Sequence, residues 1–116
     1  MDAPKEEAQA SANFWGGAFG VDPLPGGAGD PYTVLPGVLA GLQVEVQAVD
    51  DTPRYHLDIE TDNVAAEVAR LASIGAVTVS ENDGWTIMRA PGGHLFCVVP
   101  VQSDPSIFFA LAQPWA

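Results

Sequence analysis

The sequence predicts an α+β domain of two βαβββ repeats whose antiparallel strands curl around a shared cleft. Three observations support this class. Apolar and polar residues alternate strictly over 54–60, which is the period of a half-buried strand. Apolar residues then recur at helical spacing over 62–75. Finally, the sequence of Tyr32–Pro36 aligns with that of Trp85–Arg89, and each segment leads through proline and glycine into another strand.

The two repeats differ at their start. The second reads strand, helix, strand, strand, strand, whereas the first begins directly with a helix. We therefore predict that the first module lacks its opening strand. Asp2 is expected to cap a helix that begins around Ala3-Pro4 and ends at Gly20, with an apolar stripe packed into the core.

The rest of the first module is expected to be mostly strand. A loop rich in proline and glycine covers 21–31, with at most a short edge strand around 21–24. Strands are predicted over 32–35 and 41–49. The second of these alternates clearly, with Leu42, Val44 and Val46 on one face and Gln43, Glu45 and Gln47 on the other.

The second module opens with the 54–60 strand. Tyr55, Leu57 and Ile59 point to one face of it, and His56, Asp58 and Glu60 point to the other.

Asp62 or Thr61 is expected to cap the following helix, which Gly75 ends. Strands over 76–80, 84–89 and 95–101 follow, and the apolar cluster 107–111 predicts a short helix packed on the body of the domain.

Length and composition indicate one globular domain. The 116 residues are 47% hydrophobic and only 16% charged, which provides a core without disulfides or structural metal. We expect a single domain over 1–116, with module one at about 1–50, module two at about 54–101 and a C-terminal tail over 102–116.

The charge balance excludes some partners. Four basic residues against fifteen acidic ones give a formal charge of −11, and the basic residues are scattered. Nucleic acids and anionic membranes both require clustered Lys and Arg, so neither is expected as a partner.

Cysteine usage and hydropathy indicate a location. Cys97 is the only cysteine, which excludes a disulfide framework and makes a reducing cytosol the simplest compartment. No stretch reaches the about 20 apolar residues of a membrane span, and the acidic N-terminus does not look like a signal peptide. We expect a cytoplasmic protein.

Several short motifs resemble those of one superfamily. They are His-Leu-Asp-Ile-Glu, Asp-Asn-Val, Leu-Ala-Ser-Ile-Gly-Ala, Gly-Trp and Ala-Pro-Gly-Gly-His-Leu-Phe-Cys-Val-Val, in this order. The chain thus resembles the glyoxalase/bleomycin-resistance/dioxygenase (vicinal oxygen chelate) superfamily, in its glyoxalase-like branch. The resemblance is strong over 53–100 and weaker over 13–49. It implies two βαβββ modules forming a curved, cup-shaped, mixed or antiparallel sheet.

The resemblance also implies a metal-ligand set, which this chain matches in part. His56 falls on the metal histidine of the second module, and Cys97 stands where a glutamate is expected on the last strand. The corresponding position of the first module falls on Glu45 or Gln47, while an ungapped alignment of the two repeats puts Val44 there. The fourth ligand belongs to the opening strand, which we place before the first residue.

A divalent ion (Zn, Mn, Fe or Ni) is the cofactor that a complete ligand set would hold. A thiolate with an imidazole favours Zn over the hard ions, yet His56 and Cys97 are fewer than the three protein ligands usual at catalytic zinc. We therefore favour a hydrogen-bonded His56 and a buried, inert Cys97 over metal ligation.

The candidate ligand-binding residues share polar or aromatic side chains on the faces expected to line the cup. Asp58 and Glu60 are interpreted either as solvated carboxylates or as partners that tune His56. Tyr32 and Trp85 occupy equivalent repeat positions and either fill the core or line the cup. The full set is His56, Asp58, Glu60, Gln43, Glu45, Gln47, Trp85 and Tyr32.

Three functions remain open from the sequence. The first is a glyoxalase-like domain that binds a small organic molecule without a complete metal site. The second is a metal-dependent lyase, isomerase or dioxygenase whose ligands are completed by the partner in a homodimer. The third is a structural or interaction module that pairs through an exposed strand edge in the first module.

Overall fold

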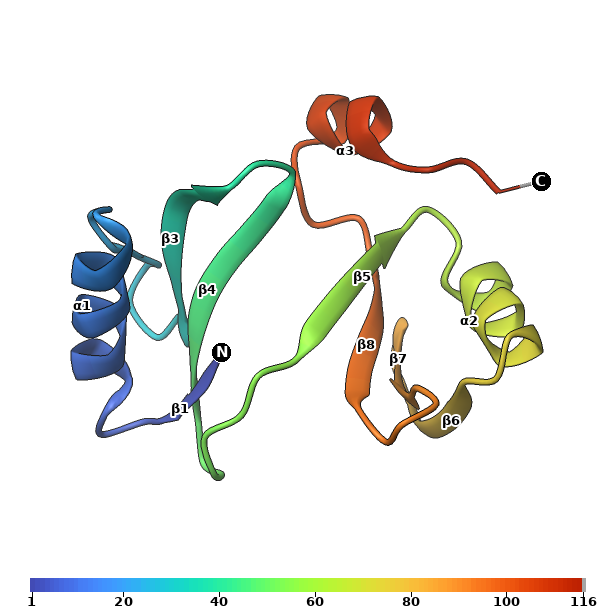
Figure 1. Ribbon diagram of the computed structural model, residues 1–116, viewed down its shortest axis with the longest axis horizontal. Helices are drawn as coiled ribbons and strands as arrows, with labels where there is room; N and C mark the ends of the chain where they lie inside the picture. The colour runs from blue at the N-terminus through green and yellow to red at the C-terminus, as the bar shows by residue number, and fades with distance from the viewer. Residues whose placement is uncertain (116) are drawn as a thin grey trace. The chain divides into compact units, whose positions relative to one another are not determined.

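The computed structural model describes residues 1–115 and divides into two compact units, Met1–Tyr55 and His56–Ala116 (Figure 1). Each unit contains its own four-stranded sheet and its own cluster of buried apolar residues. Both units follow the order strand, helix, strand, strand, strand. The predicted α+β class with two βαβββ modules is therefore confirmed.

The first unit forms a mixed sheet with one helix on it. Strand β1 is parallel to β4, and the other neighbours in the order β1-β4-β3-β2 are antiparallel. Helix α1 packs on β3 and β4 (Figure 1). The elements are β1 (Asp2–Pro4), α1 (Ala8–Phe19), β2 (Leu24–Pro25), β3 (Tyr32–Leu39) and β4 (Leu42–Val49).

The prediction that the first module lacks its opening strand was wrong. Strand β1 is that strand, and α1 begins only at Ala8, so Asp2 is no helix cap. The carboxylate of Asp2 instead accepts a hydrogen bond from Arg54 Nε at 2.9 Å, and the Asp2 amide donates to the Arg54 carbonyl. With β1 paired to β4, the argument for an edge exposed by a missing strand loses its basis.

The second unit repeats this topology in the strand order β5-β8-β7-β6, with β5 parallel to β8. Its helix α2 packs on β6, β7 and β8. The elements are β5 (Leu57–Thr61), α2 (Val64–Ser73), β6 (Val77–Asn82), β7 (Trp85–Arg89), β8 (Leu95–Pro100) and α3 (Pro105–Leu111).

Helix α2 has a different cap from the predicted one. The Asn63 side chain accepts a hydrogen bond from the Ala66 amide at 3.0 Å, so Asn63 is the N-cap in place of Asp62 or Thr61. The Thr61 hydroxyl accepts from the Asn63 amide and thus supports the turn into the helix. An Asx side chain at this position satisfies an amide that the helix itself leaves unpaired.

Buried side chains show which face of the second sheet carries the helix. Leu71 of α2 packs with Met88, Phe96 and Val98. Met88 and Val98 are fully buried. Because side chains alternate along a strand, Ile87 and Cys97 must point to the opposite face. No helix within residues 1–115 is both long and apolar enough to cross a membrane.

Candidate functional site

The sheet face that points away from α2 carries the polar residues predicted on β5, and we call it the distal face. Its residues come together across the strands, because Asp58 pairs with Cys97 in the β5–β8 register and Cys97 pairs with Ile87 in the β7–β8 register. His56 immediately precedes β5, and alternation puts Trp85 on the same face as Ile87. The distal face thus combines polar and apolar side chains from three strands.

Asp58 is the centre of a polar cluster on this face. His56 Nε2 lies 3.5 Å from Asp58 Oδ1, and the two side chains are 21% and 32% exposed. The thiol of Cys97 also hydrogen-bonds to the Asp58 carboxylate. The hydrogen bond from His56 lowers the pKa of Asp58, with further lowering from the charge of His56 and from the Cys97 thiol, and only partial burial opposes them. Asp58 is therefore an ionised hydrogen-bond acceptor at neutral pH.

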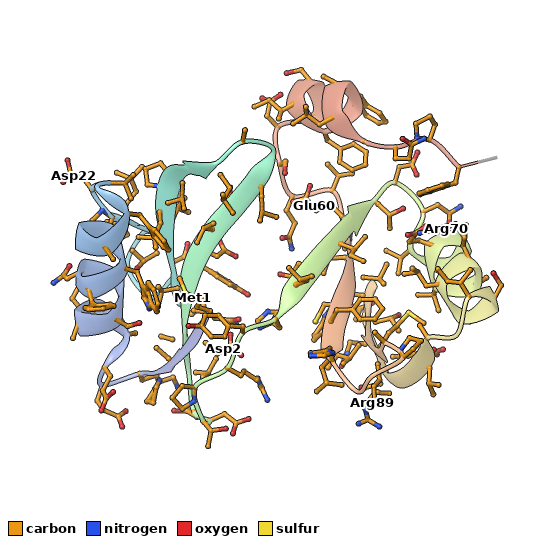
Figure 2. The ribbon with its side chains drawn as sticks, in the orientation of Figure 1. Met1, Asp2, Asp22, Glu60, Arg70 and Arg89 are labelled. Atoms are coloured by element: carbon orange, nitrogen blue, oxygen red, sulfur yellow. The ribbon has the colours of Figure 1, made fainter. Side chains whose placement is uncertain are left out.

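Glu60 has a different role from Asp58, although both are on the same strand. Its Oε2 accepts hydrogen bonds from the amide and the hydroxyl of Ser103, at 3.3 and 2.7 Å. Glu60 therefore ties the segment that leads from β8 into α3 back onto β5, and Figure 2 shows it at the end of that strand. It also lines a cavity of about 720 Å³ beside α3.

The predicted site residues of the first unit lie on β3 and β4. Gln43 Nε2 donates to Glu45 Oε2 at 3.1 Å, and Tyr32 is the backbone partner of Gln47. Because the buried Val46 packs toward α1, alternation places Gln43, Glu45 and Gln47 on the face away from that helix. The predicted set is thus brought together as two groups, one on each unit.

The strand registers identify which residue of the first unit corresponds to Cys97. Cys97 pairs with Ile87, and Val34, the repeat counterpart of Ile87, pairs with Glu45. Glu45 is therefore the counterpart of Cys97, rather than Val44 or Gln47. The same comparison makes Asp2 the counterpart of Glu60.

The arrangement within the second unit does not fit the metal site of the superfamily. Within residues 1–115 there is no group of three or more His, Cys, Asp or Glu side chains that could hold a metal ion. The two candidate ligands of this unit, His56 and Cys97, both contact Asp58. One imidazole and one thiol are fewer than the three protein ligands usual at catalytic zinc. We therefore derive no chemical step through a metal.

Comparison with known proteins identifies the family. The model of the glyoxalase-like domain matches residues 1–99. The chain belongs to the glyoxalase-like domain family. This match covers both βαβββ units, and the resemblance to the vicinal oxygen chelate superfamily is confirmed.

Three individual proteins share sequence or structural similarity with this chain. A segment of the tRNA-specific 2-thiouridylase MnmA of Rhodococcus opacus (strain B4) is 36% identical over 75 residues, which are 63% of this chain but only 20% of that enzyme. The antibiotic-binding protein TnmS3 from Streptomyces sp. CB03234 is 20% identical, with 86% of this chain and 91% of that chain covered and a TM-score of 0.36. Glyoxalase I of Leishmania major is 15% identical, with 86% and 83% covered and a TM-score of 0.41.

Sequence reasoning missed the residues that surround the cavity beside α3. Arg70 and Trp115 are 45 positions apart in the chain, yet the guanidinium of Arg70 lies 4.3 Å from the centroid of the Trp115 ring. No periodic pattern links a helix residue to an irregular C-terminal segment. The only local signal is an aromatic residue in a short tail, which alone does not indicate its partner.

Proposed function

We propose that this glyoxalase-like protein binds a small organic molecule on the distal face of its second sheet, with Asp58 as the anchoring group. The observation that carries this proposal is the carboxylate of Asp58, which His56 and Cys97 keep ionised and hydrogen-bonded. A preorganised acceptor of this kind costs little further ordering when a ligand binds. Membership in the glyoxalase-like family supports the same class of function.

The chemistry of the distal face defines the ligand. Asp58 and His56 offer polar contacts at one end, and Ile87 and Trp85 offer an apolar and aromatic surface from β7. Binding sites for small molecules commonly combine a few placed polar groups with such a lining. The expected ligand therefore carries a hydrogen-bond donor or a positive charge beside an apolar ring or chain.

The same contacts favour binding over catalysis. A carboxylate with a lowered pKa is a poor general base near neutral pH. The polar cluster is therefore suited to hold a ligand rather than to exchange protons with it.

A screen of small organic compounds by amide NMR tests this proposal. Compounds that bind are expected to shift the amide signals of Asp58, Ile87 and Cys97, and Asp58→Asn is expected to weaken binding by about tenfold, the effect of losing one charged hydrogen bond. Asp83→Asn in the β6–β7 turn is the matched control, because it removes a carboxylate that lies off this face. Binders whose affinity is the same in Asp58→Asn and the wild type would refute the anchoring role.

A further inference from the structure

The cavity of about 720 Å³ in the second unit lies away from the polar cluster of Asp58. One wall comes from the end of β5 and the first two turns of α2, and the other comes from α3 and the C-terminal segment 112–115. Neither His56, Asp58 nor Cys97 lines it. Its volume falls within the range of about 300–1,000 Å³ that is typical of small-molecule sites.

The outer wall of this cavity is held in place by specific contacts. Arg70 lies 4.3 Å from the ring centroid of Trp115, within cation–π distance. Glu67, which is buried, accepts hydrogen bonds from Arg70 Nε and Nη2 at 2.8 and 2.6 Å and thereby fixes the guanidinium. Figure 2 shows Arg70 on the side of α2 that faces the C-terminal segment. Together with the Ser103–Glu60 bonds, these contacts fasten the segment at both ends.

Aromatic rings cover much of the outer wall. Phe109 and Trp115 line the cavity while 67% and 61% of their surfaces remain exposed. Phe108 also lines it and makes an edge-to-face contact with Phe109 at a centroid distance of 5.0 Å. Exposed ring faces in a concave site are available to stack on a planar ligand or to receive a cation.

The ionised groups of the cavity lining are mostly acidic. Three carboxylates, those of Glu60, Asp62 and Glu67, face one guanidinium, that of Arg70. The bidentate bond between Glu67 and Arg70 neutralises one carboxylate, which leaves Glu60 and Asp62 as the excess negative charge. This balance opposes an anionic ligand and favours a cationic one.

We propose that this cavity is a second binding site, which takes a small aromatic organic cation. The positive group of the ligand lies near Glu60 and Asp62, and its ring lies against Phe109 and Trp115. This second site is independent of the binding site proposed on the distal face, because none of Asp58, His56 and Trp85 lines the cavity.

Benzyltrimethylammonium is a suitable probe, with phenylacetate as an anion of similar size. We expect the cation to shift the amide signals of 59–70 and 108–115 and to bind at least about tenfold more tightly than phenylacetate. Asp62→Asn and Trp115→Leu are each expected to weaken its binding by about three- to tenfold. Both positions are exposed, so these variants are expected to fold normally.

Asp58→Asn separates this site from the distal face. If the cavity binds the cation, this variant binds benzyltrimethylammonium as the wild type does. Loss of binding in Asp58→Asn with no effect of Asp62→Asn would place the cation on the distal face and overturn the second site. Equal affinity for the cation and phenylacetate, or shifts confined to residues outside the two named ranges, would overturn it as well.

Discussion

Asp58 contacts both of the other polar residues of the proposed site, His56 and Cys97. The backbone register places it beside Cys97, and His56, just before β5, lies with its Nε2 atom 3.5 Å from Asp58 Oδ1. Each of these groups hydrogen-bonds to the carboxylate and stabilises its charged form. A carboxylate whose pKa is lowered in the folded protein contributes stability above its ordinary pKa of 3.8, and this contribution is lost as the pH falls through the lowered value.

The variant Asp58→Asn tests this linkage. We expect the wild type to have a higher free energy of unfolding than Asp58→Asn at pH 7, since only the wild type gains from the charged contacts. The difference is expected to narrow as the pH falls from 3.8 toward the lowered pKa of the folded state, because the carboxylate of the unfolded chain is protonated first. Urea titrations at about pH 7 and about pH 3 measure both values. A difference that stays constant between these pH values would show that the contacts of Asp58 do not depend on its charge.

The alternation of β5 made this cluster predictable in part. The sequence pattern correctly placed His56, Asp58 and Glu60 on one face, because side-chain direction along a strand follows from local geometry alone. It did not distinguish their roles. Asp58 contacts Cys97, and Glu60 binds Ser103, which lies 43 positions further along the chain. Contacts of this kind depend on tertiary register, for which a single strand carries no signal.

At the scale of elements, β1 is the part that the sequence pattern concealed. Three residues that include a proline show no alternation, and an acidic residue before Ala3-Pro4 resembles a helix cap. The strand forms through hydrogen bonds to β4, whose residues are distant in the sequence. The Met1 carbonyl accepts from the Gln47 amide at 2.8 Å, and the Lys5 amide donates to the Val49 carbonyl at 3.0 Å. Short strands like this one are defined by tertiary hydrogen bonds rather than by local preference.

The correspondence between the two modules failed for a similar reason. An ungapped alignment assumes equal connections, but Val34 and Glu45 are one residue further apart than Ile87 and Cys97. The β3–β4 register shifts between Leu35 and Leu39, which accommodates the extra residue. Such an irregularity changes the register of every later position while leaving the strand pattern intact.

The Asp2–Arg54 contact is expected to stabilise β1. The Asp2 side chain is 3% exposed, so replacing its partner in Arg54→Met leaves a buried carboxylate without this guanidinium. We expect the free energy of unfolding to fall by about 1–3 kcal/mol, the cost of removing one partner of a buried charged hydrogen bond. Hydrogen exchange at the Gln47 amide, which donates to the carbonyl of Met1 just before β1, should accelerate as well.

Lys5→Met is the matched control for this prediction. It removes the ion pair between Lys5 and Asp50, whose side chains are 60% and 78% exposed. Exposed pairs contribute about 0–1 kcal/mol, so the control should change stability much less than Arg54→Met. Equal losses in the two variants, measured by urea unfolding, would indicate that burial of Asp2 adds nothing to the contact.

At the scale of the whole molecule, the formal charge of −11 acts on both proposed sites. An excess of carboxylates attracts cations to the surface and repels anions, which fits the acidic lining of the cavity and the ionised Asp58. The same excess opposes folding, because the compact state brings like charges together. Composition alone predicted this property, since net charge does not depend on how the chain folds.

Salt is therefore expected to stabilise the protein. Raising NaCl from about 10 to about 200 mM shortens the screening length from about 30 Å to below about 10 Å and reduces the repulsion between carboxylates. The free energy of unfolding should rise, while binding of benzyltrimethylammonium to the cavity should weaken, because its attraction to Glu60 and Asp62 is screened. A variant with Glu6→Gln, Glu81→Gln and Asp83→Asn, all at exposed positions, should gain less stability from salt than the wild type. An equal gain in both proteins would mean that salt acts through something other than the net charge.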